Sequence, residues 1–501
     1  MRESGILMHI TSLPSPYGVG TMGKAAYQFL DFLHKSGQKY WQILPVTPTG
    51  YGDSPYQSCS TYAGNHYLID LDLLVEEGLL KKSEITKNTW SDKPERVNFG
   101  YLYNHRLDVL RLAYGRFRPT EAFDTFCHEN DSWIWDFAMF MALKTKNGGK
   151  PWYQWEENLK FRDDAALTKA WQELETEIHF YCFIQYLFQR QWDRLRAYAH
   201  EKGVKIIGDV PIYVPLDSAD VWSNPHLFDL DENLDPVAVA GCPPDGFNAD
   251  GQLWGNPLYR WHVHKQENFA WWVRRMNAAG NRYDMVRLDH FRGFESYWAV
   301  PYGDETARNG QWMPGPGMDF VNAMQEHLPH VALIAEDLGF LTKAVKDLQK
   351  ASGYPGMKVL TFAFDSREPS DYLPHTYTAH SVCYTGTHDN MTTRQWFDTA
   401  PKAAVKYARE YMGIRPDEGD VWGTIRSAMA SVSNLCIIPM QDYLELGSEA
   451  RMNFPGTQSS DNWTWRATRG YLTAALSKRI YRLTELYGRL EIEKEETNGK
   501  N

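Results

Sequence analysis

The chain has 501 residues, of which 43% are hydrophobic and 23% are charged. These values are ordinary for a globular protein with a large core, and they exclude extensive disorder. Aspartates and glutamates number 63 against 52 lysines and arginines, which gives a net charge of −11. This charge argues against binding to nucleic acid or to an anionic membrane through bulk electrostatics.

Six cysteines are spread along the chain without a Cys-x-x-Cys pair. This distribution is typical of reduced thiols rather than of a zinc site or a disulfide framework. The first ten residues contain no apolar segment long enough for a signal peptide, and no part of the sequence has the uninterrupted apolar length of a transmembrane helix. We therefore expect a cytoplasmic protein.

The hydrophobic pattern predicts helices and strands in alternation. Ala26, Phe29, Leu30 and Leu33 have the spacing of one helical face, and Gly37 ends that helix. Strands are predicted at residues 40–46, 204–210, 284–289, 331–336, 357–362, 381–385 and 435–440, most of them after a helix. Such alternation favours a parallel sheet, and the number of strands favours a closed (β/α)8 TIM barrel over an open sheet.

The predicted organisation is a barrel with inserted, mainly helical subdomains. Residues 1–70 begin the barrel, residues 71–175 form a helical insertion, residues 176–490 complete the barrel and residues 491–501 are a charged tail. The eighth strand is expected between Val46 and Val204, an interval too long for one βα unit. Residues 215–262 are predicted to form a long irregular loop, and a loop of that length usually has a function.

Three carboxylic acids lie where predicted strands end. Asp289, Glu336 and Asp389 are separated by 47 and 53 residues, which is one or two βα units each. In a parallel barrel, all three would lie on the rim at the carboxyl ends of the strands. Cleavage of a glycosidic bond needs one carboxylate as nucleophile and one carboxylic acid as proton donor. The sequence therefore predicts a site for glycoside chemistry.

Each acid taken alone also has a simpler interpretation. Arg287 and Asp289 share one face of a strand, as an activated nucleophile or as a structural ion pair. Glu336 is a proton donor or an ordinary polar strand end. The pair His388 and Asp389 contacts a sugar, binds a metal or caps a turn. Their occurrence at the ends of successive strands favours the catalytic interpretation.

Residues 241–257 are too polar and too rich in glycine and proline to belong to the core. Their Asp, Asn, Gln, Phe and Trp side chains suit sugar hydroxyls and ring faces. The alternatives are a surface loop or a calcium loop, although the EF-hand pattern is not complete. Aromatic residues make up 14% of the chain, and most of them are expected to fill the core.

These segments together resemble the amylomaltases, the 4-α-glucanotransferases of the α-amylase clan, nearly from end to end. The matching segments are Gly52-Asp-Ser-Pro-Tyr-Gln57, Ala63-Gly-Asn65, Gly208-Asp-Val-Pro-Ile-Tyr-Val214, Gly251-Gln-Leu-Trp-Gly-Asn-Pro-Leu258, Arg287-Leu-Asp-His-Phe-Arg-Gly293, Ala335-Glu-Asp-Leu-Gly339, Pro355-Gly-Met-Lys-Val-Leu360, Gly386-Thr-His-Asp-Asn390 and Ile438-Pro-Met-Gln-Asp442. The Gln-Leu-Trp-Gly-Asn-Pro and Pro-Gly-Met-Lys-Val-Leu runs are specific to amylomaltases.

The resemblance implies a role for each acid: Asp289 is the nucleophile, Glu336 the acid/base, and Asp389 holds the distorted sugar ring. The residues implied to bind substrate are Arg287, His388, Asp209, Asp337, Trp254, Gln252, Tyr56 and Ser54. The implied substrates are maltooligosaccharides and α-1,4-glucans, with glucose as acceptor or product, and no metal or other cofactor is required.

Two positions depart from the family pattern. Gly246 stands where the family usually has an aromatic residue, and Met391 stands where it usually has an acid. Three other functions remain compatible with the sequence: a retaining α-glucan hydrolase, a catalytically silent glucan-binding protein, and a metal-dependent hydrolase that uses His388 and Asp389 as ligands.

Overall fold

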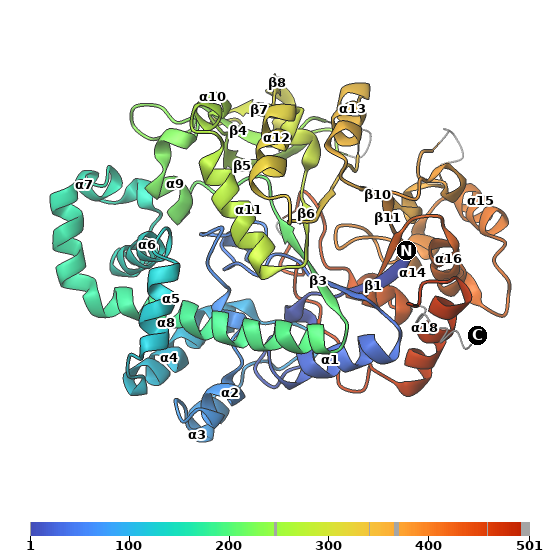
Figure 1. Ribbon diagram of the computed structural model, residues 1–501, viewed down its shortest axis with the longest axis horizontal. Helices are drawn as coiled ribbons and strands as arrows, with labels where there is room; N and C mark the ends of the chain where they lie inside the picture. The colour runs from blue at the N-terminus through green and yellow to red at the C-terminus, as the bar shows by residue number, and fades with distance from the viewer. Residues whose placement is uncertain (1, 245–247, 340, 365–369, 458, 492–501) are drawn as a thin grey trace, which may run out of the picture.

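A closed barrel of eight parallel strands forms the centre of the protein (Figure 1). The computed structural model describes residues 2–244, 248–339, 341–364, 370–457 and 459–491. In spatial order the barrel strands are β1 (Glu3–Leu7), β12 (Leu435–Pro439), β11 (Ser381–Tyr384), β10 (Gly356–Val359), β9 (Leu333–Ala335), β6 (Met285–Leu288), β3 (Lys205–Val210) and β2 (Tyr40–Gln42). The predicted (β/α)8 barrel is confirmed.

The eighth strand is β1, at the start of the chain, so its predicted location between Val46 and Val204 was wrong. The segment has one short apolar run, too short for a period-of-two pattern to identify it. Pairing defines it instead, because β1 pairs with β12 on one side and with β2 on the other and so closes the barrel. Gly5 permits this close approach, since a Cβ there would lie 2.4 Å from the Tyr40 carbonyl oxygen.

Amphipathic helices surround the barrel. The helices that precede or follow its strands include α1 (Lys24–Lys35), α8 (Asp164–Glu201), α11 (Ala270–Arg282), α12 (Met318–His327), α13 (Lys343–Ser352), α14 (Thr393–Thr399), α15 (Lys402–Met412), α16 (Gly419–Ala430), α17 (Met440–Tyr443) and α18 (Ala474–Leu486). Helix α1 buries Ala26, Phe29, Leu30 and Leu33, as its spacing predicts. No helix in the part of the chain that the structure describes is long and apolar enough to cross a membrane.

Residues 71–175 are helical and lie to one side of the barrel (Figure 1). They contain α2 (Leu71–Glu76), α3 (Lys82–Thr86), α4 (Phe99–Arg116), α5 (Glu121–Glu129), α6 (Ile134–Lys146), α7 (Glu157–Lys160) and the first turns of α8. Helix α8 passes residue 175 without a break, so the insertion and the barrel share it. The boundaries of the insertion stay a prediction.

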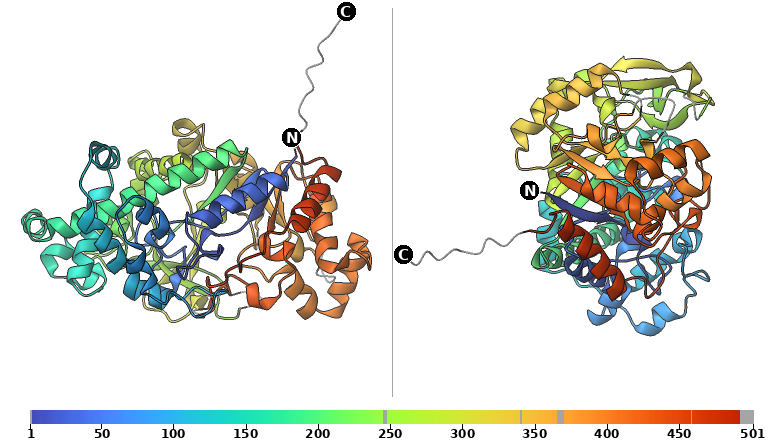
Figure 2. Two further views of the ribbon diagram at one scale, coloured as in Figure 1. Left: turned by 90° about the horizontal axis from the view of Figure 1, so that it is seen from below. Right: turned by 90° about the vertical axis from the view of Figure 1, so that its right-hand side faces the viewer.

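The stretch 215–262, predicted to be irregular, contains ordered elements. It forms α9 (Ala219–Ser223), β4 (Ala238–Cys242), β5 (Gln252–Pro257) and the start of α10 (Trp261–Gln266). The two strands join β7 (Ser296–Pro301) and β8 (Gln311–Pro314) in an antiparallel sheet of order β5-β4-β7-β8. The prediction missed this sheet because β7, which pairs with β4 at its centre, lies far along the sequence. Figure 2 shows the sheet at the edge of the molecule.

Closure of the barrel by β1 predicts that Gly5→Ala destabilises the fold. The added methyl group would clash with the Tyr40 backbone, and overpacking of this kind typically costs about 1–3 kcal/mol. We expect a lower melting temperature in a calorimetric scan. Gly115→Ala in α4 is the matched control, because no atom lies within 4 Å of its new Cβ, and it should leave stability unchanged or raise it. Equal melting temperatures for the two variants would contradict this account.

Candidate active site

Four acids meet at the carboxyl ends of neighbouring barrel strands. Asp209 on β3 is paired in register with Arg287 on β6. Asp289 and Glu336 directly follow Leu288 and Ala335, which are register partners on the adjacent strands β6 and β9. Asp389 follows β11, two strands beyond β9. The structure therefore brings the three sequence-predicted acids to one rim, together with Asp209.

Arg287 lies at the centre of this group. Its Nη1 is 2.9 Å and 2.7 Å from the two carboxylate oxygens of Asp209 and 2.9 Å from Oδ1 of Asp289. The side chains of Asp209 and Arg287 are 0% and 3% exposed, whereas that of Asp289 is 25% exposed. Asp209 therefore neutralises a buried cation, and Asp289 offers a carboxylate that a substrate can reach.

Glu336 is held by two backbone amides. The N–H of His290 donates to Oε2 at 2.7 Å, and the N–H of Leu338 donates to Oε1 at 2.9 Å. His290 has φ +51°, a left-handed conformation that a non-glycine residue seldom adopts. His290 directly follows Asp289, and its own N–H holds Glu336. The turn after β6 therefore fixes the positions of both acids.

Asp389 is positioned by three residues. Its Oδ2 is 3.2 Å from Nε2 of His388, and its Oδ1 accepts a 2.7 Å hydrogen bond from Nδ2 of Asn453. Arg451 donates to the backbone carbonyl of Asp389 at 3.0 Å. The Asp389 side chain remains 38% exposed. It is therefore an oriented carboxylate that remains accessible to solvent.

Asp442 organises the loop that carries His388 and Asp389. Its buried carboxylate accepts hydrogen bonds from the hydroxyl of Thr385 at 2.5 Å and from the N–H and hydroxyl of Thr393 at 2.8 Å and 2.7 Å. These bonds tie the two ends of the 385–393 loop to the segment after β12. Asp442 therefore supports the site without lying in it.

Aromatic residues connect the two sides of the rim. The hydroxyl of Tyr56 donates to Asp209 at 2.7 Å, and its ring stacks on His388 with centroids 5.2 Å apart and planes at 12°. Ser54 accepts a hydrogen bond from the N–H of Tyr56 and so shapes this turn. Trp254 packs edge-on against His290, with centroids 4.8 Å apart.

Two more of the predicted substrate-binding residues have contacts within the protein. The side chain of Gln252 accepts a 3.2 Å hydrogen bond from Nε1 of Trp254, and both residues are half-buried. Asp337 is buried, and its Oδ1 accepts a 2.6 Å hydrogen bond from the N–H of Met357 on β10. The structure therefore places Asp337 against the barrel backbone, where it braces the strand end beside Glu336.

Sequence reasoning missed Asn453 and Trp463. Asn453 binds Asp389, and the ring of Trp463 lies 5.8 Å from that of Tyr56 and 5.9 Å from that of His388. Both residues follow β12 in a segment without regular structure, where no periodicity marks them. Of the two departures from the family pattern, Met391 lies within the 385–393 loop and is 38% exposed, and Gly246 lies outside the described residues.

Burial and neighbouring charges shift the pKa values of the three acids in different directions. Burial raises the pKa of Asp289 against the opposing effect of Arg287, and burial likewise raises the pKa of Glu336. For Asp389, burial also acts to raise the pKa, but His388 and the Asn453 amide outweigh it and lower the pKa below its usual range. The site therefore retains a proton on the Asp289–Glu336 pair at a pH where Asp389 is fully ionised.

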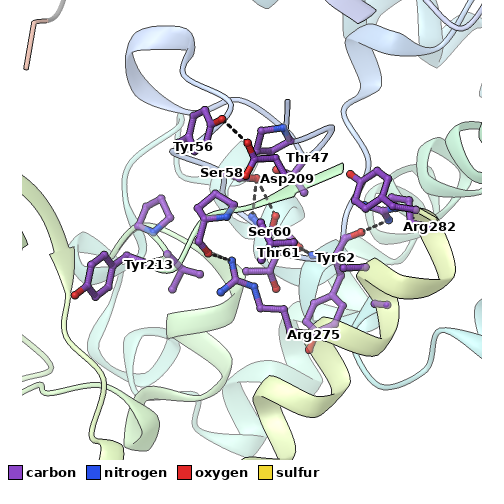
Figure 3. A pocket seen from close by; sticks show the side chains of 18 residues that line it. Thr47, Tyr56, Ser58, Ser60, Thr61, Tyr62, Asp209, Tyr213, Arg275 and Arg282 are labelled. Atoms are coloured by element: carbon purple, nitrogen blue, oxygen red, sulfur yellow. Dashed lines mark hydrogen bonds between the residues drawn. The ribbon is translucent and has the colours of Figure 1, made fainter. Parts of the chain in front are cut away.

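A small cavity adjoins the site on the side of Asp209 (Figure 3). Its lining comes from residues 45–62, from β3 and the residues after it, and from α11, and it includes Tyr56 and Asp209. Its volume of about 40 Å³ is enough for a few water molecules. Asp289, Glu336 and Asp389 do not line it, so it is distinct from the group of accessible carboxylates.

This arrangement defines an enzyme of the parallel-barrel class with carboxyl groups at its reactive rim. The 4-alpha-glucanotransferase family model (Glyco_hydro_77) matches residues 8–473. The chain is 48% identical over 488 residues to the 4-alpha-glucanotransferase of Clostridium butyricum, covering 97% of this chain and 100% of the relative. It is 45% identical over 503 residues to that of Thermus thermophilus, covering 98% and 99%. The chain belongs to the 4-alpha-glucanotransferase family.

A solved structure agrees with this assignment. The amylomaltase of Streptococcus agalactiae, solved in complex with acarbose, matches with a TM-score of 0.95 and 41% identity, over 98% of this chain and 100% of that one. The family resemblance inferred from the sequence is therefore confirmed.

The buried ion pair predicts the effect of Arg287→Leu. Without the guanidinium, Asp209 would be a buried carboxylate with no cation, and breaking such a pair typically costs about 3–5 kcal/mol. We expect a lower melting temperature and loss of activity.

The double variant Arg287→Leu/Asp209→Asn removes the uncompensated charge and is the matched control. It should recover part of the lost melting temperature but no activity. A single variant as stable as the parent protein would show that Arg287 is not needed to neutralise Asp209.

Proposed function

We propose that the protein transfers α-1,4-glucan segments between maltooligosaccharides by a retaining double displacement. The observation that carries the mechanism is the pair of carboxyl groups at the ends of adjacent strands, Asp289 against a buried cation and Glu336 on two backbone donors. Retaining enzymes place the two carboxyl groups roughly 5–5.5 Å apart. Neighbouring strands are about 4.8 Å apart, which suits this separation.

In the first step, the Asp289 carboxylate attacks the anomeric carbon of a bound glucan while Glu336 donates its proton to the departing glycosidic oxygen. Arg287, 2.9 Å from Asp289, favours the ionised nucleophile. As Glu336 becomes negative, the N–H groups of His290 and Leu338 stabilise the new carboxylate. A β-linked glucosyl-enzyme and a free sugar chain result.

In the second step, Glu336 accepts the proton of an incoming sugar hydroxyl, normally the 4-OH. That hydroxyl oxygen attacks the anomeric carbon, the bond to Asp289 breaks, and an α-linkage forms again. The bond made equals the bond broken, so the reaction needs no cofactor. Asp389, ionised and held by His388 and Asn453, is placed to bind hydroxyls of the sugar ring that distorts in both steps.

The substrates and the compartment follow from the same assignment. We propose maltooligosaccharides and longer α-1,4-glucans as donors and acceptors, with glucose as an acceptor or product. Tyr56, Trp254 and Gln252 would contact glucose units on either side of the bond. Five cysteines are free thiols, which supports a reducing compartment such as the cytoplasm; they are Cys59, Cys127, Cys182, Cys383 and Cys436.

Transfer predicts the products formed from maltotriose. The purified protein should produce glucose together with longer maltooligosaccharides, and the number of reducing ends should stay nearly constant because each transfer conserves linkages. Chromatography of the products combined with a reducing-sugar assay measures both quantities. Steady growth in reducing ends at the full reaction rate would identify a hydrolase, and unchanged maltotriose would identify a protein that only binds glucan.

The proton-donor role predicts the behaviour of Glu336→Gln. The amide preserves the shape but cannot donate a proton, and general acid–base catalysis typically contributes about 10²–10⁴-fold to the rate. Donors with activated leaving groups need little protonation, so the rate of the first step should fall less with them than with ordinary donors. An equal loss of rate with activated and ordinary donors would show that Glu336 is not the proton donor.

The pH profile gives a second test of the same role. Glu336 acts as an acid only while protonated, so its raised pKa keeps the enzyme active to higher pH, and kcat/KM falls as the pH rises through that pKa. Asp289 must be ionised, so kcat/KM also falls towards low pH. We expect a bell-shaped profile, and with activated donors Glu336→Gln should lose the alkaline limb. An alkaline limb that persists in this variant would belong to another group.

A further inference from the structure

The antiparallel sheet beside the barrel has an apolar face that the proposed reaction does not use. Across the sheet in the order β5-β4-β7-β8, one row of paired residues is Leu253, Gly241, Trp298 and Trp312. Paired residues on neighbouring strands direct their side chains to the same face. Leu253, Trp298 and Trp312 therefore lie on one face, which we call the tryptophan face.

The tryptophan face points away from the main core. Tyr297 and Met313, which alternate with these residues along β7 and β8, pack against the main hydrophobic core. Trp298 instead packs against a separate small cluster of Val239, Val300 and Ala307. One face of the sheet therefore covers the core, and the other carries only this small cluster.

Large apolar side chains are concentrated on and beside this face. Trp312 is 42% exposed and Leu253 is 38% exposed, while Val237 and Tyr302, just beyond the ends of β4 and β7, are more than half exposed. These four are a third of the twelve exposed large hydrophobic residues in the described part of the chain, although the sheet is a small part of the surface. Exposed apolar side chains gathered in this way mark an interaction site.

The aromatic rings of the face are held in place by the protein. Nε1 of Trp298 donates a 2.8 Å hydrogen bond to the carbonyl of Ala307, and the rings of Trp298 and Trp312 lie 5.1 Å apart. Gly310 leaves room for Trp298, because a Cβ there would lie 2.2 Å from Nε1. The guanidinium of Arg292 lies 4.0 Å from the centre of the Trp312 ring. A flat ligand would therefore meet rings that are already ordered.

Two segments, edge strand β5 and the turn after β6, connect the face to the rim of the active site. Arg292, which packs on Trp312, is three residues beyond Asp289 in the same turn. Leu253 is adjacent in sequence to Trp254, whose ring packs against His290 at the rim. Edge strand β5 thus presents one side chain to the pocket and the next to the tryptophan face.

Polar groups adjoin the exposed rings. Nη2 of Arg292 donates to the hydroxyl of Ser296 at 3.3 Å, and this hydroxyl donates to Glu295 at 2.5 Å. An aromatic plane bordered by such groups suits a pyranose, which has an apolar face and hydroxyls around its edge. The row spans three strand spacings, roughly 14 Å, which is longer than one sugar ring.

We infer that the tryptophan face binds the distal part of an α-1,4-glucan whose reacting end occupies the carboxylate pocket. This inference rests on the proposed function, since it takes its ligand from that reaction. Short substrates would fill the pocket without reaching the face, whereas long chains would gain an additional contact at Trp312. The face would thereby favour long glucans over short ones.

Trp312→Ala in the full-length protein tests this inference, with maltotriose and long amylose as alternative substrates. Loss of one aromatic stacking contact should lower kcat/KM for amylose about three- to tenfold and leave kcat/KM for maltotriose unchanged. Trp312→Phe keeps an aromatic plane and should recover most of the loss. Tyr481→Ala on α18 is the matched control, because Tyr481 is also 42% exposed but belongs to a different part of the surface.

Binding can be measured by calorimetry in a Glu336→Gln background that slows turnover. Trp312→Ala should weaken the binding of maltoheptaose and leave that of maltotriose unchanged. If Trp312→Ala affects short and long glucans equally, or affects neither, the inference is wrong. The proposed function would still stand as long as the parent protein transfers glucan from maltotriose. If the parent protein transfers no glucan from maltotriose or amylose, the proposed function fails and this inference with it.

Discussion

The buried guanidinium of Arg287 is the constraint on which the rim depends. A cation that water barely reaches must be neutralised, and here the inaccessible Asp209 and the accessible Asp289 share that task. The same contacts extend across the pocket, because Asp209 accepts from Tyr56, Tyr56 stacks on His388, and His388 contacts the accessible carboxylate of Asp389. One network thus fixes one inaccessible acid, Asp209, and two accessible acids, Asp289 and Asp389.

This network also explains why a proton is available for catalysis. Several carboxyl groups of the rim share the guanidinium of Arg287, and the ionisation of Asp289 and Glu336 is opposed by burial and by neighbouring carboxylates. At Asp389 the effect of burial on the pKa is outweighed by His388 and Asn453, whereas at Asp289 and Glu336 burial prevails and the pKa is raised. The proton that the proposed mechanism needs therefore stays on the pair that acts on the glycosidic bond.

The barrel converts distant segments into one pocket. Strands β3, β6, β9 and β11 deliver the acids, while the loop around Tyr56, strand β5 and the segment at Asn453 supply the surroundings. The turn after β6 has a particular place in this arrangement, since it carries Asp289, the strained His290 that holds Glu336, and Arg292 against Trp312. It links the reactive acids to the sheet on which we place the distal glucan.

The amino-acid sequence by itself determined the parallel barrel, the three acids at strand ends and the family, because buried strands and short polar segments leave local patterns. It did not reveal β1, the antiparallel sheet or Asn453, which depend on partners hundreds or tens of residues away. Tertiary structure also decided which carboxylates are accessible: Asp209 and Asp337 are buried against Arg287 and the β10 backbone, whereas Asp289 and Asp389 are partly exposed. Burial is set by neighbours in space, and no local pattern encodes it.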